Sequence, residues 1–314
     1  MRKAIIDVGS NSVLLTVADH TSNGWQIVHE TSAVTGLGTG TKRTGLIQSQ
    51  GANETLAALR TAFTEAKNLS AESITAAGTM ALRIATNAQD FLGQAKDQNT
   101  PVQILSGENE ALLGFLAVAE DQFLDLSDRI TIIDPGGHST ELLTAQKNGD
   151  NWKILLKKSF PVGALGLIET HFPTETPNFA ERLAAVSTID DIIGLEYLPH
   201  QVGTTVALGA TGTNLISIRE KLTHWQPELV HGTTLDFEEI SRAVGWMCDM
   251  TEAERKSIPG LEPGREKTIH IGALILERFM QATHALECRV SVRGWRHALL
   301  DHPEILNSPQ TVQA

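Results

Sequence analysis

Cysteine is scarce in this sequence, and so are long apolar runs. The two cysteines among 314 residues, Cys248 and Cys288, have neither the paired spacing of a disulfide framework nor that of a metal site. No stretch approaches the roughly 18 to 20 apolar residues of a membrane-spanning helix, and Asp7 interrupts the first apolar run too early for a signal peptide. We therefore expect reduced, buried thiols in a soluble, cytoplasmic protein with no membrane partner.

Basic residues are also in the minority. Lysine and arginine together number 25 against 37 aspartates and glutamates, which gives a formal net charge of -12. Non-specific binding of nucleic acid depends on a basic surface that neutralises phosphates, so this composition argues against a nucleic-acid partner. A phosphate-bearing ligand would instead require a local basic pocket.

The apolar content is sufficient for more than one hydrophobic core. Hydrophobic residues make up 41% of the chain, and 314 residues exceed what a single core usually holds. We predict two α/β domains, residues 1–123 and 124–314. A last helix at about 295–306 is a candidate to pack back on the first domain.

Each half shows the same order of elements, three strands followed by alternating helices and strands. In the first half the expected strands are 3–8, 13–18, 25–34, 74–77 and 102–105, and the expected helices are 53–67, 81–95 and 108–120. In the second half the expected strands are 129–133, 141–146, 153–160, 205–208 and 289–292, with helices at 164–171, 180–193, 212–222, 237–248 and 267–283. The repetition indicates a duplicated domain.

Two hexapeptides strengthen the case for duplication. Asp7-Val8-Gly9-Ser10-Asn11-Ser12 aligns with Asp134-Pro135-Gly136-Gly137-His138-Ser139, and each closes an apolar strand and leads into another. One such turn alone would be a weak signal, because Asp-Gly turns join strands in many folds. Their recurrence predicts two loops whose backbone amides and hydroxyls bind phosphate. The candidate contacts are Gly9, Ser10, Asn11, Ser12, Gly136, Gly137, His138 and Ser139.

Three carboxylates near these turns suit a hard cation. Asp7 and Asp134 end their strands, and Glu141 follows the second turn. Because Mg²⁺ prefers oxygen ligands of this kind, we predict that these three residues hold Mg²⁺, or Mn²⁺, between successive phosphates. The alternative is a pair of ordinary hairpin turns with surface aspartates.

A third glycine-rich segment, Leu208-Gly209-Ala210-Thr211-Gly212-Thr213, follows a predicted strand and precedes a predicted helix. Amides at a helix N-terminus favour anions. Gly209, Thr211, Gly212 and Thr213 are therefore further candidate phosphate contacts. The alternative is that the glycines only allow the helix to pack closely on the strand.

These motifs resemble those of the exopolyphosphatase and guanosine pentaphosphate phosphatase (Ppx/GppA) family, and the match runs nearly end to end. It also includes Gly36-Leu37-Gly38, Gly78-Thr79-Met80-Ala81-Leu82-Arg83, Ser106-Gly107-Glu108-Asn109-Glu110-Ala111 and Ile258-Pro259-Gly260-Leu261-Glu262-Pro263-Gly264-Arg265. The resemblance implies a short, two-domain member with duplicated actin-like, ribonuclease H-like domains and a cleft between them. It also implies a hydrolase that releases the terminal phosphate of polyphosphate or guanosine pentaphosphate, and a homodimer.

The resemblance assigns roles to two further residues. Glu110 stands where the family has its catalytic base, early in a predicted helix, where a carboxylate can orient and deprotonate an attacking water. Arg83 stands where the family contacts the substrate phosphate, and a guanidinium can hold two phosphate oxygens at once. Without the resemblance, Arg83 would be taken for a solvated surface residue. The alternative for Glu110 is that it only complements the helix dipole, but this role fits Glu108 better.

Three positions depart from the family pattern. Pro135 and His138 replace an isoleucine and a glycine. Because proline donates no N–H and a Cβ resists positive φ, the second loop would hold phosphate less closely. Alternatively, His138 donates to a phosphate oxygen or only fills space. Asn109 replaces a glutamate next to Glu110, and the chain ends soon after Leu300 without the extra C-terminal domains of long members, which favours short substrates.

Basic residues gather in two places, at 255–267 and 289–297. A charge run usually forms a solvated face, and this is the interpretation we favour for Arg255 and Lys256. Arg293 and Arg296 are candidate ligand contacts.

Two other function classes compete with the hydrolase. A nucleotide-dependent small-molecule kinase on the same fold would need an acceptor site, for which we find no sequence element. A sensor that binds polyphosphate or an alarmone without turnover is suggested by Pro135 and His138. The presence of Glu110, Asp134 and Glu141 argues against the sensor.

Overall fold

The computed structural model describes residues 1–194 and 203–307, which divide into two compact units. The first unit contains Met1–Leu113 and the described segment that starts at Trp295, and the second contains Gly114–Gly294. The boundary lies inside helix α5 (Gly107–Ala119), ahead of the predicted boundary at 123/124. A helix runs through the boundary, and the single glycine there, Gly114, is not enough to mark a linker, which is why composition did not reveal the position.

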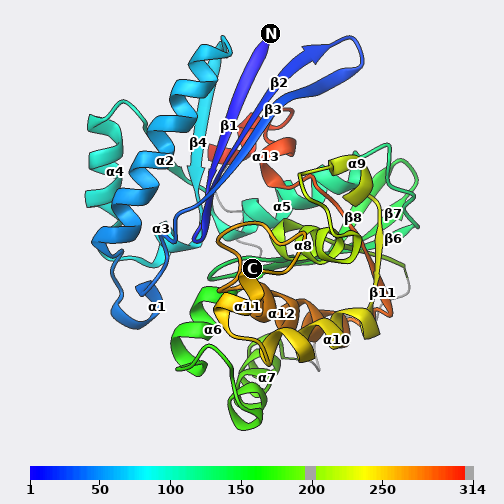
Figure 1. Ribbon diagram of the computed structural model, residues 1–314. Helices are drawn as coiled ribbons and strands as arrows, with labels where there is room; N and C mark the ends of the chain where they lie inside the picture. Colours follow the sequence, from blue (N-terminus) through cyan, green and yellow to red (C-terminus); the bar gives the residue numbers. More distant parts are fainter. Residues whose placement is uncertain (195–202, 308–314) are drawn as a thin grey trace. The chain divides into compact units, whose positions relative to one another are not determined.

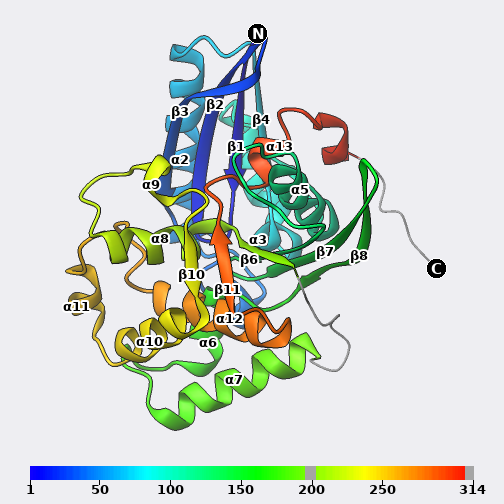
Figure 2. The same cartoon turned by 90° about the vertical axis from the view of Figure 1, so that its right-hand side faces the viewer.

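The first unit contains a five-stranded sheet in the order β3-β2-β1-β4-β5. β2 is antiparallel to β1 and β3, whereas β4 is parallel to β1 and β5. Figures 1 and 2 show α2 and α4 on one face of this sheet and α13 on the other. The elements are β1 (Arg2–Val8), β2 (Ser12–Thr21), β3 (Gly24–Val34), α1 (Thr41–Thr44), α2 (Ser49–Asn68), β4 (Ser73–Gly78), α3 (Met80–Ile84), α4 (Ala88–Asp97), β5 (Gln103–Ile104), α13 (Trp295–Ala298) and η2 (Pro303–Asn307).

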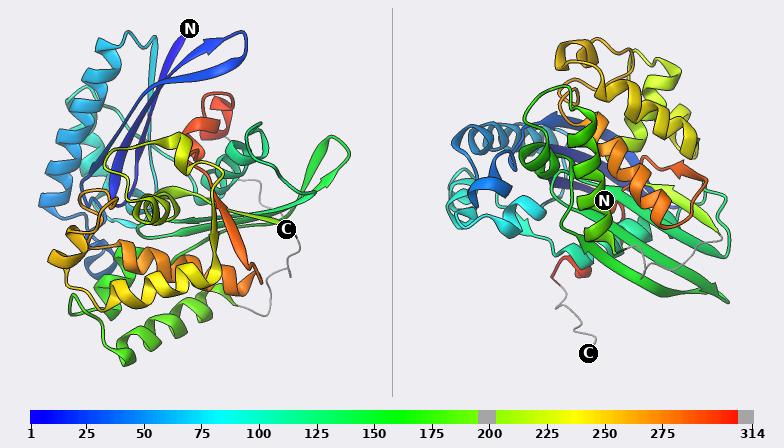
Figure 3. Two further views of the ribbon diagram at one scale, coloured as in Figure 1. Left: turned by 45° about the vertical axis from the view of Figure 1, so that its right-hand side comes forward. Right: turned by 90° about the horizontal axis from the view of Figure 1, so that it is seen from below.

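The second unit contains a six-stranded sheet in the order β10-β11-β9-β6-β7-β8. Figure 3 shows α6, α7, α10 and α12 together on one side of this sheet. The elements are β6 (Arg129–Pro135), β7 (Thr140–Asn148), β8 (Asn151–Phe160), α6 (Ala164–His171), α7 (Phe179–Ile193), β9 (Thr204–Ala207), α8 (Gly209–Glu220), α9 (Pro227–Val230), β10 (Thr234–Asp236), α10 (Phe237–Cys248), α11 (Glu252–Lys256), α12 (Ile269–Ala282) and β11 (Glu287–Val290).

The two sheets repeat one topology. The order β3-β2-β1-β4 of the first corresponds to β8-β7-β6-β9 of the second, with two antiparallel pairs and one parallel pair in each. The corresponding hairpins β2–β3 and β7–β8 also each have a register shift, at Val17/Ala18 and at Thr144/Ala145. The shifts are separated by 127 residues (144 − 17), the same spacing as between Asp7 and Asp134 (134 − 7). The predicted duplicated α/β fold is therefore confirmed.

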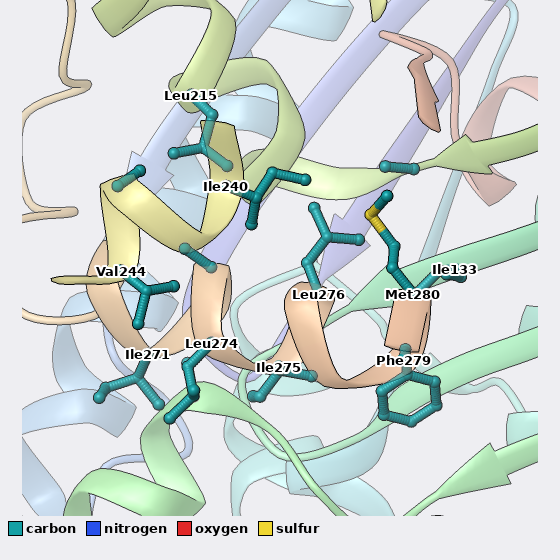
Figure 4. Close-up of a cluster of buried hydrophobic side chains, with 14 of the residues drawn as sticks. Ile133, Leu215, Ile240, Val244, Ile271, Leu274, Ile275, Leu276, Phe279 and Met280 are labelled. Carbon is teal, nitrogen blue, oxygen red and sulfur yellow. The ribbon is translucent and has the colours of Figure 1, made fainter. Parts of the chain in front are cut away.

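Each unit has its own hydrophobic core. In the first unit the stripe of α2 that includes Leu59 and Ala66 is buried against the sheet. In the second unit α12 is apolar almost all round, and Figure 4 shows Ile271, Leu276 and Phe279 among the packed side chains. A helix of this composition is stable only when neighbours surround it, and α6, α7, α8 and α10 do so here.

The two cysteines are buried and free, as predicted. Burial raises the pKa of Cys248 to about 11 and that of Cys288 to about 12, so both stay as inert thiols at neutral pH. Across residues 1–194 and 203–307, no helix combines the length and apolarity that crossing a bilayer requires.

Candidate active site

The two candidate loops have the same backbone geometry. The Gly9 amide donates to the Ser12 carbonyl oxygen at 2.9 Å, and the Gly136 amide donates to the Ser139 carbonyl oxygen at 2.8 Å. No residue of either turn has a positive φ. The expected conflict between the Cβ of His138 and a left-handed backbone therefore does not arise.

The first turn is fixed by the segments around it. The Ser10 hydroxyl accepts a hydrogen bond from the Ala81 amide at 3.1 Å, which links the turn to the start of α3. The Asn11 carbonyl oxygen accepts from the Thr35 amide at 2.9 Å, and the Ser10 carbonyl oxygen accepts from the Gly38 amide at 2.7 Å. The turn thus has its carbonyl oxygens bonded within its own unit.

Asp7 lies in the middle of the first sheet. It is opposite Leu14 of β2 and beside Ala77 of β4, near the carboxyl end of β1. Ligands of open α/β sheets bind at the carboxyl ends of parallel strands. The half-buried Asp7 carboxylate is therefore placed at the end of the sheet where such ligands enter.

The second turn is held against the start of α6. The Leu165 amide donates to the Gly137 carbonyl oxygen at 2.8 Å. At Gly163 a Cβ would come within 2.4 Å of both the Gly137 carbonyl carbon and the His138 amide nitrogen. Only glycine allows the two segments to approach so closely. Sequence reasoning missed Gly163, and its one signal is the Gly163-Ala164 pair ahead of a predicted helix.

Neither Pro135 nor His138 removes a donor from the second turn. Pro135 is the last residue of β6 and pairs with Thr140, so it replaces a strand residue rather than a turn amide. The His138 side chain is buried, and its Nε2 lies 4.0 Å from Glu169 Oε1. Burial of the ring favours the space-filling alternative, and a role in phosphate binding stays a prediction.

Two predicted metal ligands of the second unit are neighbours. Asp134 and Glu141 are direct partners across the β6–β7 ladder, which brings their Cβ atoms to roughly 4.5–5.5 Å. Glu141 is 4% exposed and its Oε1 accepts a hydrogen bond from the Ser159 hydroxyl at 2.6 Å. Two close carboxylates repel each other unless a cation lies between them, so the donor set fits a divalent ion. Sequence reasoning also missed Ser159, which has no signal in the sequence.

The carboxylate pair does not by itself form a complete metal cage. Within the described ranges no group of three or more His, Cys, Asp or Glu side chains gathers closely enough to hold an ion. Mg²⁺ usually keeps several waters and binds one or two carboxylates together with substrate phosphates. Asp134 and Glu141 match that incomplete type of site.

The glycine-rich segment forms the first turn of α8. The helix starts at Gly209 and not at Gly212 as predicted, because Gly209 adopts a φ of +75° that turns the chain directly into the helix. A Cβ at Gly209 would lie 2.6 Å from Asp134 Oδ1, so the helix start directly contacts that carboxylate. The first amides of a helix have no intrahelical acceptor, and no side chain caps this end.

The remaining residues of the segment face the protein. A Cβ at Gly212 would lie 3.3 Å from Val290 and 3.4 Å from Ala207, so this glycine serves close packing on the sheet. The Thr213 hydroxyl donates to the Ala210 carbonyl oxygen at 3.2 Å, and Thr211 is 8% exposed. Backbone amides, rather than hydroxyls, are what the segment offers to an anion.

In the first unit the structure brings Arg83 and Glu110 together. Arg83 Nη1 donates to Glu110 Oε2 at 2.7 Å and to the Leu105 carbonyl oxygen at 2.8 Å. Glu110 is 9% exposed and lies in the first turn of α5. At the start of this helix the Asn109 backbone amide donates to the Ser106 hydroxyl oxygen at 3.1 Å. Arg83 is therefore not a solvated surface residue.

A pocket of about 430 Å³ opens beside this pair. Its lining combines the polar residues Arg83, Thr86 and Ser106 with apolar residues such as Leu82 and Ile104. Burial raises the pKa of Glu110, and the charge and hydrogen bond of Arg83 act in the opposite direction. A carboxyl group with a raised pKa is a stronger base once ionised, which suits proton abstraction near neutral pH.

Replacing Arg83 by methionine is expected to raise the pKa of Glu110 further. The substitution keeps the length of the side chain but removes the positive charge and the hydrogen bond that stabilise the carboxylate. Titration of the ¹³C-labelled Glu110 carboxyl group would then move to higher pH than in the parent protein. Arg60→Met, at an exposed arginine of α2, is the matched control and leaves this titration in place. An unmoved titration in Arg83→Met would contradict the prediction.

The basic residues near the C-terminus are engaged within their own units. Arg255 is 1% exposed, so the interpretation as a solvated residue is wrong; four backbone carbonyl oxygens accept hydrogen bonds from it. Arg296 donates to Thr16 and Glu30. Arg293 Nε lies 3.8 Å from the buried Asp121 carboxylate.

Comparisons with known proteins agree with the motifs. Residues 16–304 match the model of the Ppx/GppA phosphatase family. A guanosine-5'-triphosphate,3'-diphosphate pyrophosphatase of Pseudoalteromonas translucida is 30% identical over 67% of this chain and 41% of its own length. Exopolyphosphatase 2 of Mycobacterium tuberculosis is 25% identical over 88% of this chain and 89% of its own. The chain spans less than half the length, 43% and 41%, of two curated relatives that it matches.

A solved structure gives the same result. The crystal structure of the Aquifex aeolicus member of the Ppx/GppA family covers 99% of this chain and 99% of its own, with a TM-score of 0.77 and 28% sequence identity. The family model, this exopolyphosphatase and this structure each match most of the chain, and the family model includes the second of the two turns. The chain belongs to the Ppx/GppA phosphatase family.

Proposed function

We propose that the protein hydrolyses the terminal phosphoanhydride bond of polyphosphate or guanosine pentaphosphate with Glu110 as the general base. The observation that carries the proposal is the buried Arg83–Glu110 pair beside an open pocket. The names of two relatives, an exopolyphosphatase and a guanosine pentaphosphate pyrophosphatase, support both substrate classes. The proposal therefore includes one reaction and two candidate substrates, polyphosphate and guanosine pentaphosphate.

In the proposed reaction Glu110 takes a proton from a water molecule. The water oxygen attacks the terminal phosphorus, the bond from phosphorus to the bridging oxygen breaks, and the shortened chain leaves with that oxygen. Arg83 uses Nη1 for Glu110, whereas its Nη2 meets only the weak acceptor Met80 Sδ, at 3.6 Å, among the residues that the structure describes. A phosphate oxygen is a stronger acceptor than a thioether sulfur and would take its place, so one guanidinium would orient both the base and the phosphate.

A divalent cation fits the second unit. Asp134 and Glu141 would hold Mg²⁺ or Mn²⁺, and Asp7 is a further proposed ligand from the first turn. When bound, the ion would neutralise charge on the phosphates and leave them more open to attack. The amides of the two turns and of the α8 N-terminus would bind phosphate oxygens.

The kinase and sensor hypotheses receive no specific support. The sensor was suggested by Pro135 and His138, but Pro135 lies in the strand and the turn has no positive φ. A cytoplasmic location and a homodimer remain part of the proposal, since they follow from composition and from the family.

Phosphate release tests the proposal. Polyphosphate, guanosine pentaphosphate and ATP are each incubated with the protein in Mg²⁺, in Mn²⁺ and in excess EDTA. We expect release from at least one of the first two substrates, with a loss of more than about 100-fold in EDTA because the carboxylate pair then repels the phosphates. Equal release with and without metal, or no release from either substrate by folded protein, would overturn the proposal.

A further inference from the structure

The described C-terminal segment, Trp295–Asn307, is closely packed in the first unit. Leu299 and Leu300 are 1% and 2% exposed, and Trp295 is 4% exposed. We refer to this segment as the C-terminal strap. Figure 2 shows it in orange and red next to α5.

The strap is anchored by polar contacts at its start. Glu30 of β3 accepts hydrogen bonds from Arg296 Nη2 at 2.9 Å and from Thr16 at 2.8 Å, and it contacts His297 Nε2 at 3.0 Å. Burial raises the pKa of Glu30, but the hydrogen bond with His297 and the charge of Arg296 outweigh it and hold this pKa well below the usual range. The carboxylate therefore stays ionised and anchors the strap over the physiological pH range.

The far end of the strap contacts the residue next to the proposed base. The Asn109 side-chain amide donates to the Ile305 carbonyl oxygen at 2.8 Å, and Asn109 is 8% exposed. A glutamate, which the family pattern has at this position, would direct a carboxylate at that carbonyl oxygen and could not donate. The contact therefore depends on the residue by which this chain departs from the pattern.

We infer that Asn109 is a positioning residue that, through its hydrogen bond to the C-terminal strap, fixes the first turn of α5 and thereby aligns Glu110 with Arg83. The inference rests on the proposed role of Glu110 as the base. The amides of Asn109 and Glu110 both bond to Ser106, so a shift of this turn moves the two side chains together. Helix ends fray unless side chains or neighbouring segments hold them.

The charged groups around Glu110 determine how its pKa responds when its side chain moves. Arg83 of α3 contacts it directly. Glu108 of its own helix and Glu304 of η2 are exposed, so solvent screens them. A turn that moves Glu110 away from Arg83 loses the interaction that stabilises the carboxylate, and the pKa of Glu110 then rises.

The test compares Asn109→Leu, which keeps the branched shape without a donor, with Asn109→Ala and with Trp25→Phe. The last variant removes the 2.8 Å hydrogen bond from Trp25 to Asp301, in the middle of the strap, and serves as the control. In both Asn109 variants we expect kcat to fall about 3- to 30-fold, the acidic limb of the pH profile to move to higher pH, and amide exchange in residues 107–113 to accelerate about tenfold. Trp25→Phe is expected to change none of these.

Three contrary outcomes can be told apart. If Asn109→Leu folds and keeps the parent kcat and acidic limb while Glu110→Gln abolishes turnover, the positioning role is wrong and the proposed base stands. If Glu110→Gln turns over like the parent protein, the proposed base is wrong, and the positioning role falls with it. If kcat falls in the Asn109 variants but the acidic limb of the pH profile does not move, Asn109 has only a structural role and the inference is also overturned.

Discussion

Replacement of Glu110 by glutamine is expected to lower kcat by about 10²- to 10⁴-fold, the range that a positioned general base contributes. Glutamine has the shape of glutamate, and its side-chain oxygen can still accept the hydrogen bond from Arg83. The variant therefore keeps its fold and its substrate binding, but it cannot take a proton from water. Phosphate release under single-turnover conditions measures the loss, and equilibrium binding of a non-hydrolysable substrate analogue checks that affinity is retained.

Glu108→Gln is the matched control for this experiment. Glu108 lies in the same turn of α5 but is exposed, so its loss is expected to change kcat by no more than about twofold. Equal losses in the two variants would show that the helix terminus needs negative charge rather than a base at one position. Full activity in Glu110→Gln would remove Glu110 from the mechanism, and retained binding without turnover in the parent protein would point to a sensor.

The duplicated turns were predictable because their signal is local and occurs twice. Asp7 and Asp134 each end an apolar strand, and the small residues that follow them strongly favour a tight turn. The structure adds that both turns share one backbone hydrogen bond and that the strands around them have matching register shifts. Alternating apolar residues specify such hairpins without reference to the rest of the chain.

Contacts between distant residues were beyond the reach of sequence patterns. Ser159 holds the Glu141 carboxylate and Gly163 allows α6 to approach the second turn. The sequence marks neither role clearly, because a cross-strand hydrogen bond and a close backbone approach are set by the fold. The start of α8 was misplaced because a glycine with positive φ can end a loop or begin a helix. The pairing of Arg83 with Glu110 likewise joins residues that no periodicity relates.

The wrong assignment of Arg255 has a physical reason. Arg255 and Lys256 are neighbours in a short, polar helix, and a charge pair of this kind usually faces solvent. In the structure the Arg255 side chain is instead buried, and its guanidinium donates to backbone carbonyl oxygens of several segments. Composition cannot distinguish these cases, because the acceptors are backbone carbonyl oxygens and have no sequence signature.

Arg255→Met is expected to lower the free energy of unfolding by about 3 to 5 kcal/mol. Arg255 Nε donates to the Glu266 carbonyl oxygen at 2.6 Å, and Nη1 donates to the carbonyl oxygens of Met247, Met250 and Glu175. The guanidinium thus joins the end of α10 to the segments before α11 and α12. Methionine fills similar volume but leaves these buried acceptors without a donor, each at a cost of roughly 1–3 kcal/mol before relaxation. Urea unfolding followed by circular dichroism measures the change.

Two further measurements separate the lost donor from other effects of the substitution. Lys256→Met removes a neighbouring but exposed charge and is expected to change the free energy of unfolding by less than about 0.5 kcal/mol. Burial and the charge of Arg255 lower the pKa of His270 to about 3, so the removal of that charge is expected to raise the His270 pKa in the folded state. An Arg255→Met protein as stable as the parent, with an unmoved His270 titration, would mean that water takes the place of the guanidinium. A large loss of stability with a raised His270 pKa would establish Arg255 as the cation that holds these segments of the second unit together.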